Sequence, residues 1–527
     1  MSEPSSFDLQ ALLKRVEELE AALRETTEHL AAALQLNEYY RQQLHGSKSE
    51  RYDPAQEHLD LGEDTLGKPE PSGPNGSAPS GPEDEAKKTK AKRTRRTKDQ
   101  LFPRWLKTII VEELIPDEVK ANPEAYREIE SREHRELETT RGQVYWRVTR
   151  IPKFVLKADK LEKPVTSPAP TPSIPGTLCG PHLISQIVCD KFCDHLPHYR
   201  QSQRFARRHG IELQRGTINT WTAQLADLLR PVNEAIKAEV LDTDALQIDE
   251  TPGSYLAPGT GKSQTGYWWA YRNIHTSTVY FDWHTSRAMD CLLDMLGFDE
   301  ESKTLLFTGH IQCDGFKAYD ALVKQFKGIV LAGCMAHLRR KFFDARKQAP
   351  DHSIPVLLKI QGIYRVERDL KLSKAPPGCR EMIRRTRSLP LLKELKTLID
   401  GIEKIKPLPQ SKLGKALTYA RNQWSKMEVS ILNAELEIDN NRIENAIRPL
   451  KLGLKNYLFM GSAEAGKDSA LFYTLIENCK VHDLDPEAYL VEVIEALRDP
   501  AMLERVAELT PAALAAARNA VGELKTA

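Results

Sequence analysis

The chain has 527 residues, which is too long for a single compact domain and predicts three or four folding units. Hydrophobic residues make up 40% of the sequence and charged residues 28%, and no apolar run reaches the roughly 18 residues of a membrane-spanning helix. No signal peptide is evident, and the eight scattered cysteines do not have the density of a disulfide-stabilised secreted protein. We therefore expect a soluble protein of the reducing cytoplasm that has no contact with a membrane.

The net charge of +1 conceals an uneven distribution of charge along the chain. Residues 1–86 contain 7 basic and 18 acidic residues, a net charge of −11, whereas the remainder contains 68 basic and 56 acidic residues, a net charge of +12. A basic body behind an acidic arm is typical of proteins that bind a polyanion. Ordinary solvated surface charge is the alternative interpretation.

Residues 7–45 have the pattern of one long helix. Apolar residues recur in steps of three and four from Leu9 to Leu44, which is a heptad pattern with Asn37 at an a position. A buried amide at that position fixes register and favours two strands. We therefore expect residues 1–50 to form a coiled coil that makes the chain a homodimer or a higher oligomer. A single amphipathic helix packed on its own chain is the alternative.

Residues 51–100 are predicted to be a disordered linker with a basic tract. From about Leu61 to Asp84 the sequence is rich in Pro, Gly, Ser and Glu, and such a composition cannot bury enough apolar surface to fold. Eight Lys and Arg residues then lie within positions 87–98, where they can bind phosphates by releasing counterions. A solvated linker or a localisation signal are the alternatives. The DNA contacts expected here are Lys92, Arg93, Arg95 and Arg96.

Residues 101–165 are predicted to form a small separate unit. Ile109–Val111 and Gln143–Val148 have the composition of strands, and we expect a charged helical stretch around Glu124–Glu138 between them. A proline-rich joint at Pro164–Pro175 follows. The pattern of this unit indicates no chemistry of its own.

Residues 176–240 are predicted to be a helical domain that binds DNA. A helix at about His198–Arg208 and another that starts near Thr217 are separated by a break at Gly210, which is the pattern of a helix-turn-helix. Helix pairs of this kind also occur in proteins that never bind DNA. The N-terminal residues of the second helix usually meet the bases. The DNA contacts expected here are Arg204, Arg207, Arg208, Arg215, Thr217 and Asn219.

Residues 241–345 alternate between predicted strands and helices, which indicates an α/β unit. Residues 346–435 are helical and charged, residues 436–480 resume the α/β pattern with two helices, and residues 481–527 form a helical, alanine-rich tail. Strands are expected at 245–249, 267–272, 278–283, 304–307, 311–314 and 329–332, and helices at 287–296 and 316–326.

Three acids stand at marked positions of this α/β unit. Asp249 ends the first predicted strand before a turn at Pro252-Gly253, Asp314 ends a later strand, and Glu444 opens a helix. We expect them to converge on two divalent ions, because a few carboxylates suffice to hold Mg²⁺ or Mn²⁺ for phosphoryl transfer at DNA. Three carboxylates brought together repel one another, so the site is expected to fill when metal or substrate arrives.

Structural roles compete with this hypothesis. An Asp at a strand end is usually a turn former, and Glu444 can pair with Arg448 on its own helix. Asp439 and Glu250 are acids at comparable positions of the same segments. The spacing of the three acids therefore does not establish catalysis by itself.

Several strings resemble one known family, the large transposase of the insertion-sequence-66 family, which is a DDE-type transposase. The strings are spread over nearly the whole chain, and together they are highly specific. They are Ser47–Arg51, His195–Gln201, Asp249–Pro252, Cys313–Tyr319, Cys334–Phe342, Asp439–Pro449 and Lys455–Phe459.

The resemblance implies a multidomain α/β protein with a ribonuclease-H-like catalytic core at 241–345 and 436–480. A helical insertion at 346–435 interrupts this core, and the coiled coil and the helix-turn-helix precede it. By motif position, Asp249, Asp314 and Glu444 are implied to be the catalytic triad and the ligands of two Mg²⁺ or Mn²⁺ ions. Further DNA contacts implied by the matched strings are Arg339, Arg340, Arg448, Lys451 and Lys455.

The activity that the resemblance implies is DNA transposition. The enzyme would hydrolyse one DNA strand at each end of the mobile insertion-sequence element (an element end) and use the freed 3′ hydroxyl to attack target DNA. No covalent protein–DNA intermediate would form. Its partners would be the double-stranded DNA of the element ends and of the target, and accessory proteins encoded by the element are candidate partners. The implied location is the bacterial cytoplasm, in association with the nucleoid. A non-catalytic DNA-binding regulator and a structure-specific two-metal nuclease are the alternatives.

One departure from the family concerns zinc. The family usually carries a cysteine-rich zinc-binding segment before the helix-turn-helix, but residues 101–165 contain no cysteine, so we expect no zinc in that unit. Cys334 and His337 have a spacing seen among metal ligands, but no second pair lies nearby in the sequence. We expect a buried thiol with an imidazole beside the active site there, and not a metal site.

Overall fold

The computed structural model describes residues 108–140, 142–157, 163–257 and 262–526. The predicted coiled coil of residues 1–50 and the predicted DNA contacts Lys92, Arg93, Arg95 and Arg96 lie outside the described residues. Within these described ranges, no helix combines the length and the apolar character needed to cross a bilayer.

The described chain begins with a sheet of long strands. Strand β3 (Gln143–Leu156) pairs in parallel with β1 (Thr108–Glu113) and in antiparallel fashion with β2 (Tyr126–Thr140). This confirms the two predicted strands. Shorter elements complete the unit: α3 (Asp117–Ala121), the 3₁₀ turn η3 (Pro123–Ala125) and β4 (Val165–Thr166), which pairs with β3.

The helix predicted around Glu124–Glu138 is wrong, because this stretch forms most of β2. Charged residues of β2 can pair with opposite charges on β3: Glu130 lies opposite Lys153 and forms an ion pair with it. Opposite charges at cross-strand positions stabilise a sheet, whereas sequence alone shows only a run of charge that resembles a solvated helix.

Three helices follow the first sheet: α4 (Pro181–Phe192), α5 (His198–His209) and α6 (Arg215–Leu241). Gly210 ends α5 with a φ of 61°, a left-handed conformation that glycine adopts at no steric cost. The predicted pair of helices with a break at Gly210 is therefore confirmed. The second helix begins at Arg215, slightly before the predicted start, and continues to Leu241.

The central sheet has five strands in the order β11-β10-β5-β6-β7. Strand β10 is parallel to β5 and to β11, whereas β5, β6 and β7 form an antiparallel meander. The strands are β5 (Ala245–Leu256), β6 (Ser263–Asn273), β7 (Val279–His284), β10 (Gly309–Gln312) and β11 (Ile329–Ala332). Strands lie in all the predicted places of this region, but the one predicted at 245–249 continues to Leu256 and the one predicted at 311–314 ends at Gln312, so neither ends on its acid. The strand predicted at 304–307 is the short β9 (Thr304–Leu305), paired with β8 (Phe298–Asp299).

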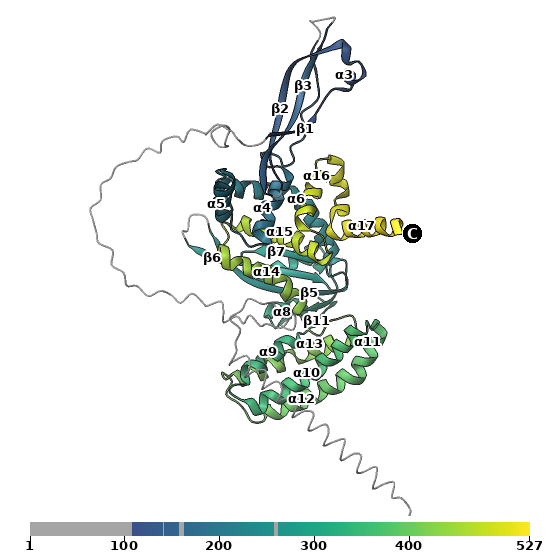
Figure 1. Cartoon of the computed structure of the whole chain (residues 1–527). Helices are drawn as coiled ribbons and strands as arrows, with labels where there is room; N and C mark the ends of the chain where they lie inside the picture. Colours follow the sequence, from purple (N-terminus) through teal and green to yellow (C-terminus); the bar gives the residue numbers. More distant parts are fainter. Residues whose placement is uncertain (1–107, 141, 158–162, 258–261, 527) are drawn as a thin grey trace, which may run out of the picture. The chain divides into compact units, whose positions relative to one another are not determined.

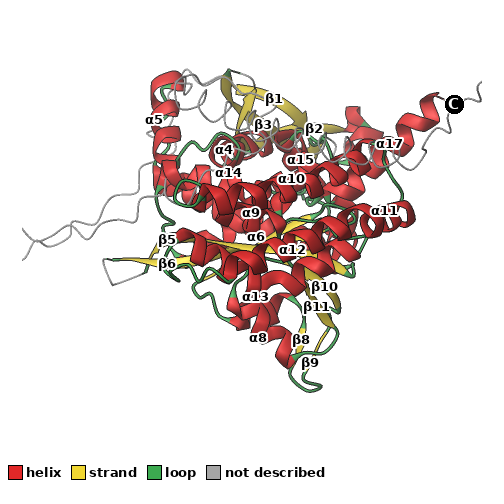
Figure 2. Cartoon of the chain, turned by 90° about the horizontal axis from the view of Figure 1, so that it is seen from below, coloured by secondary structure: helices red, strands yellow, loops and turns green. Residues whose placement is uncertain are grey.

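The predicted turn at Pro252-Gly253 is wrong, because β5 continues to Leu256 and stays paired with β6 throughout. The indole of Trp268 covers Gly253, where a Cβ atom would lie 1.9 Å from the ring. Glycine thus serves close ring packing within the strand and not a turn. The ends of β5 and β6 extend past the surrounding helices (Figure 2).

Helices cover both faces of the central sheet. Helices α6, α14 (Asn441–Tyr457) and α15 (Ala463–Val481) contact β5, β6 or β7, and α7 (Met289–Met295) packs with α8 (Lys317–Gln325), which contacts β11. Side chains of α15 also close the β7 edge: Thr474 Oγ1 accepts the N–H of Phe281 at 2.9 Å, and Asn478 Oδ1 accepts that of Val279 at 2.9 Å. An edge covered in this way cannot pair with another strand.

A helical unit lies between β11 and α14 in the sequence, and its helices form the green bundle in Figure 1. Its helices pack around a core of their own, which includes Leu338, Phe342, Ile360 and Leu395. This confirms the predicted helical segment, although the unit already begins with α9, before residue 346. Its elements are α9 (Met335–Ala345), α10 (Pro350–Leu372), α11 (Pro377–Ile383), the π-helical turn η4 (Arg384–Ser388), α12 (Leu389–Glu403) and α13 (Lys412–Leu432).

The chain ends, as predicted, in a helical tail. After α15 come α16 (Pro486–Ala496), the 3₁₀ segment η5 (Pro500–Leu509) and α17 (Pro511–Thr526). Helix α16 packs against α4, so the tail joins the helical domain that precedes the sheet.

Arg384 ties the helical unit to the segment that leads into α14. Its side chain is 2% exposed, and its guanidinium donates to both carboxylate oxygens of Glu367 at 2.8 Å. The same guanidinium donates to the carbonyl oxygens of Ser430 at 3.2 Å, Asn433 at 2.7 Å and Leu436 at 2.9 Å. One buried cation therefore fixes the exit of α13.

We predict that Arg384→Ala lowers the free energy of unfolding by about 3–5 kcal/mol, because it leaves Glu367 and three carbonyl groups without their donor. The matched control is Arg385→Ala, which removes only an exposed ion pair with Glu381 and should change stability by less than about 0.5 kcal/mol. Urea unfolding of both variants measures the difference. Equal effects would contradict the role assigned to Arg384.

Candidate active site

Two glutamines fasten the loop before α14 to the middle of the central sheet. Gln247 of β5 and Gln312 of β10 are register partners and are fully buried. Gln247 Nε2 donates to Gln312 Oε1 at 2.8 Å and to the carbonyl of Asp439 at 3.0 Å. Gln312 Nε2 donates to the carbonyl of Glu437 at 2.6 Å. This glutamine clamp (Gln247 and Gln312) places residues 437–440 across the strands.

Asn440 completes the attachment and starts α14. Its Nδ2 donates to the carbonyl of Ile248 at 3.1 Å, and its backbone N–H donates to Cys334 Sγ at 3.2 Å. Its own carbonyl accepts the N–H of Glu444 at 3.2 Å. The first turn of α14, which carries Glu444, is therefore held beside β5.

Asp249 and Asp314 follow the clamp on neighbouring parallel strands. Each stands two residues beyond a clamp glutamine: Asp249 lies within β5, and Asp314 lies just after the end of β10 at Gln312. Burial raises the pKa of Asp249 well above its usual range, and the nearby carboxylates of Glu250, Glu444 and Asp314 raise it further, against the opposing charge of Lys451. The three predicted acids thus belong to one negatively charged region.

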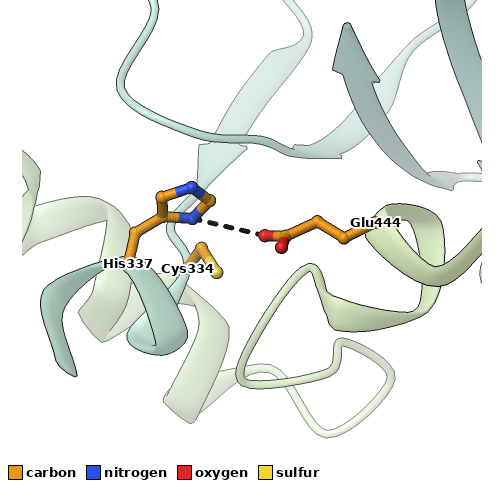
Figure 3. Close-up of side chains that lie close together, drawn as sticks. All are labelled: Cys334, His337 and Glu444. Carbon is orange, nitrogen blue, oxygen red and sulfur yellow. Dashed lines mark ion pairs between the residues drawn. The ribbon is translucent and has the colours of Figure 1, made fainter. Parts of the chain in front are cut away.

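Glu444 is held from the side of α9. Arg340 Nη2 lies 3.4 Å from Glu444 Oε2, and His337 Nδ1 lies 3.7 Å from Glu444 Oε1. Cys334, one turn before His337, brings its sulfur into the same group (Figure 3). The structure therefore places the thiol and the imidazole beside the carboxylate of the third acid.

The two alternative acids are both held by hydroxyl donors. Glu250 is paired with Arg287 and accepts the Tyr319 hydroxyl at 2.9 Å on Oε2. Burial raises the pKa of Glu250, and Arg287 and Tyr319 oppose the rise. Asp439 accepts the Tyr364 hydroxyl at 2.7 Å and the N–H of Asn441, the first residue of α14, at 3.1 Å. These contacts give Glu250 and Asp439 structural roles.

A basic flank follows Glu444 along α14. Arg448, Lys451 and Lys455 lie four, seven and eleven residues after Glu444, so they share its face of the helix. Lys451 is exposed and close enough to Asp249 to lower its pKa. Arg339 is exposed on α9 and lies over the ring of Phe343 at 5.7 Å, whereas Arg340 is engaged with Glu444.

The residues of the predicted helix-turn-helix differ in whether they are hydrogen-bonded or ion-paired to neighbouring helices. Arg207, Arg208, Arg215 and Thr217 are exposed on α5 and at the start of α6. Arg204 instead forms an ion pair with Asp190 of α4. Asn219 Oδ1 accepts the Nδ1–H of His198, whose pKa burial lowers to about 3, so that the imidazole is neutral. Arg204 and Asn219 therefore brace the helices.

The donor set of the three acids suits a hard divalent cation, because Mg²⁺ and Mn²⁺ prefer carboxylate oxygens and retain several waters. Burial is the main cause of the raised pKa of Asp249, and the charges of Glu250, Glu444 and Asp314 add to it, so a cation bound here would favour the ionised carboxylate. The trio is not one of the two described clusters whose ligand atoms lie within 4.8 Å of one another. Those clusters are Cys334, His337 and Glu444, and Asp282, His284 and Asp294.

Sequence reasoning did not find the clamp. A signal was present, because each glutamine is a single polar residue in an apolar run and each precedes its acid by two residues. Buried amides of this kind are kept where both hydrogen-bonding ends find partners.

Comparison with known proteins gives a family match. Residues 176–468 match the family model described as Transposase IS66 family, and residues 474–512 match the IS66 C-terminal element. The chain is 30% identical over 345 residues to the uncharacterized protein y4jD of Sinorhizobium fredii, which covers 63% of this chain and 65% of the relative. The uncharacterized protein y4qI of the same organism is 30% identical over 364 residues, which covers 66% of this chain and 64% of the relative. The chain thus aligns with less than two thirds of the length of these relatives.

We predict that Asp249→Asn stabilises the protein in metal-free buffer at pH 8, with a rise in Tm of about 1–3 °C. A pKa raised in the folded state means that the wild type loses stability as pH rises above the carboxyl pKa of the unfolded chain, about 3.9, and the amide removes this loss. Thermal unfolding with a chelator measures this gain in Tm, and thermal unfolding with Mn²⁺ measures stabilisation by the bound ion. Mn²⁺ should raise the Tm of the wild type more than that of the variant.

The control for this prediction is Asp320→Asn, which removes a carboxylate paired with Lys426 at 2.6 Å and should give no gain in Tm. A loss of stability in Asp249→Asn would contradict the assignment of Asp249 to a repulsive cluster.

Proposed function

Because the chain belongs to the IS66 transposase family, we propose that it is a DDE-type DNA transposase with a ribonuclease-H-like catalytic core. The strand order supports the core: three antiparallel strands are followed by two that run parallel to the first, in the order β11-β10-β5-β6-β7. The observation that carries the proposal is that hydrogen bonds hold the start of α14 beside β5, so that Glu444 and Asp314 lie near enough to Asp249 to raise its pKa, although these acids are up to 195 positions apart in sequence.

In the proposed reaction, Asp249, Asp314 and Glu444 would hold two Mg²⁺ or Mn²⁺ ions. Bound ions of this kind orient the attacking oxygen and neutralise charge on the leaving oxygen. The protein's own contribution is positional: the clamp fixes the loop before α14, Asn440 fixes its first turn, and Arg340 holds the carboxylate of Glu444. Water would be the nucleophile for strand cleavage, and a 3′ hydroxyl the nucleophile for joining.

The basic flank of α14 suits the DNA backbone. Arg448, Lys451 and Lys455 follow Glu444 on one helical face, so a strand whose scissile phosphate lies at the acids would place neighbouring phosphates along this face. Arg339 extends the positive charge on α9. The helix-turn-helix would hold the element end through Arg207, Arg208, Arg215 and Thr217, which are exposed. Element ends, target DNA, a homodimer or higher oligomer, and accessory proteins are the proposed partners.

We predict that Asp249→Asn, Asp314→Asn and Glu444→Gln each reduce strand cleavage and joining by at least about 100-fold while binding of the duplex persists. The assay uses a labelled element-end duplex, a target duplex and Mg²⁺ or Mn²⁺. Asp320→Asn is the control because it removes an acid outside the proposed site. A single variant that still joins DNA would remove that acid from the triad.

The same assay separates the alternative functions. Cleavage without joined products would indicate a structure-specific nuclease. Binding without cleavage in the presence of the accessory proteins would indicate a non-catalytic regulator.

We predict that the double variant Arg207→Gln/Arg208→Gln weakens binding to element-end DNA about uniformly across sequences, because exposed arginines here would contact phosphates. The slope of log affinity against log salt should fall by about 2. The charge-matched control is Arg230→Gln/Arg505→Gln, since these arginines are paired with Asp227 and Glu508. Fluorescence anisotropy at several salt concentrations measures the affinity and the salt slope of each variant. Equal slopes for the two double variants would refute the assignment of Arg207 and Arg208 to phosphate contacts.

A further inference from the structure

Cys334, His337 and Glu444 form a compact group that combines sulfur, nitrogen and oxygen donors. Their ligand atoms all lie within 4.8 Å of one another (Figure 3). Cys334 precedes α9, His337 lies in its first turn, and Glu444 reaches them from the first turn of α14. Two rigid helix starts therefore present the three donors, and no long loop is involved.

The spacing of the group is close to that of a tetrahedral metal site. Ligand bonds of about 2.0–2.3 Å place neighbouring donors about 3.3–3.8 Å apart. His337 Nδ1 and Glu444 Oε1 already lie 3.7 Å apart, which corresponds to one edge of such a tetrahedron. The remaining separations stay within 4.8 Å, so small rotations of the side chains would complete three edges and leave a fourth position for water.

Two observations other than proximity point to a bound cation. His337 Nδ1 and Glu444 Oε1 are buried atoms, and among the described residues neither has a hydrogen-bond partner. Buried polar atoms are nearly always satisfied, and a cation between these two would satisfy both. In addition, the backbone N–H of Asn440 donates to Cys334 Sγ at 3.2 Å. Such an outer hydrogen bond supports a metal-bound thiolate.

We propose that Cys334, His337 and Glu444 bind a transition-metal ion of the zinc class. Thiolate and imidazole donors select Zn²⁺ or Co²⁺ over Mg²⁺, which takes oxygen ligands. The site is distinct from the hard-cation site of the three acids but shares one carboxylate with it. This revises the expectation from sequence, which found no further ligand near Cys334 and His337; the third ligand comes from more than 100 positions later in the chain.

The shared carboxylate gives the site a regulatory consequence, which rests on the proposed function. Glu444 bound to the softer ion would be drawn towards α9, away from Asp249 and Asp314. Zn²⁺ would therefore inhibit Mg²⁺-dependent strand cleavage, and a chelator would restore it. Binding itself does not depend on the chain being a transposase.

The first experiment measures binding with Co²⁺ as the probe, on the full chain freed of metal by a chelator. Wild type should bind Co²⁺ with a thiolate-to-cobalt absorption band, and Zn²⁺ should displace it. Cys334→Ala should lose the band, and His337→Gln should lower Co²⁺ affinity by at least about 100-fold. Thermal unfolding checks that each variant is folded, and His337→Gln, at a half-buried position, keeps the test valid if Cys334→Ala does not fold.

Two cysteine variants serve as matched controls. Cys189→Ala removes a thiol from the Cys189–Cys193 pair on α4, and Cys313→Ala removes a buried thiol next to Asp314. Both should retain the band, because neither thiol belongs to the group. A wild type without a thiolate band, or a band that survives in Cys334→Ala, would overturn the proposal.

The second experiment measures inhibition of strand cleavage by Zn²⁺, relative to the activity of each protein without Zn²⁺. Wild type should be inhibited at Zn²⁺ concentrations that fill the site. His337→Gln should need at least about 100-fold more Zn²⁺ for the same inhibition. Cobalt binding with no DNA cleavage under any condition would reject the proposed function but keep the metal site. Cleavage that Zn²⁺ leaves unchanged while the site is filled would reject the regulatory consequence.

Discussion

The buried hydrogen bonds between Gln247, Gln312 and the loop at residues 437–440 are the constraint on which the candidate site depends. The site is assembled from a meander, a parallel strand and a helix that follows a long helical unit, so chain connectivity alone does not bring the acids together. Two side-chain amides at paired strand positions provide the link. Because both are fully buried, each unmade bond would leave a polar group without water, and the loop is held at one position. Arg384 acts in the same direction from the other side, since it fixes the exit of α13 just before this loop.

Sequence patterns predicted most elements but not the contacts that join them. Apolar periodicity and β-branched runs located the strands of the central sheet, and Gly210 marked the end of α5, because these signals are local. Two predictions were wrong where a distant partner decides the outcome. Charged residues of β2 pair with residues of β3, and Gly253 leaves room for the indole ring of Trp268. Neither stretch therefore has the structure that its own composition suggests. The three acids stay a prediction, made from expected strand and helix ends and from the family resemblance, although β5 continues past Asp249 and β10 ends before Asp314. The clamp, Arg384 and the contact of Glu444 with α9 depend on pairs far apart in sequence.

Glu444 lies between two chemically different environments. On the side of β5 lies Asp249, whose surroundings also include the carboxylates of Glu250 and Asp314 and the amine of Lys451, a set that favours hard cations and phosphates. On the side of α9 its neighbours are a thiol, an imidazole and a guanidinium. If each group binds its proposed ion, the two sites would compete for this one carboxylate.

The discontinuity of the α/β unit bears on the order in which the protein becomes complete during synthesis. Asp249 and Asp314 leave the ribosome together with the five strands, but Glu444 follows only after the helical unit between β11 and α14. The core of that unit includes Ile438, and β5 and β10 also need residues 437–440 to satisfy their buried glutamines, so both parts are completed by the same late segment. A nascent or truncated chain that ends within the helical unit would contain Asp249 and Asp314 but not Glu444. Its buried glutamines, Gln247 and Gln312, would lack their hydrogen bonds to residues 437–440. Such a fragment would be a ready substrate for proteolysis.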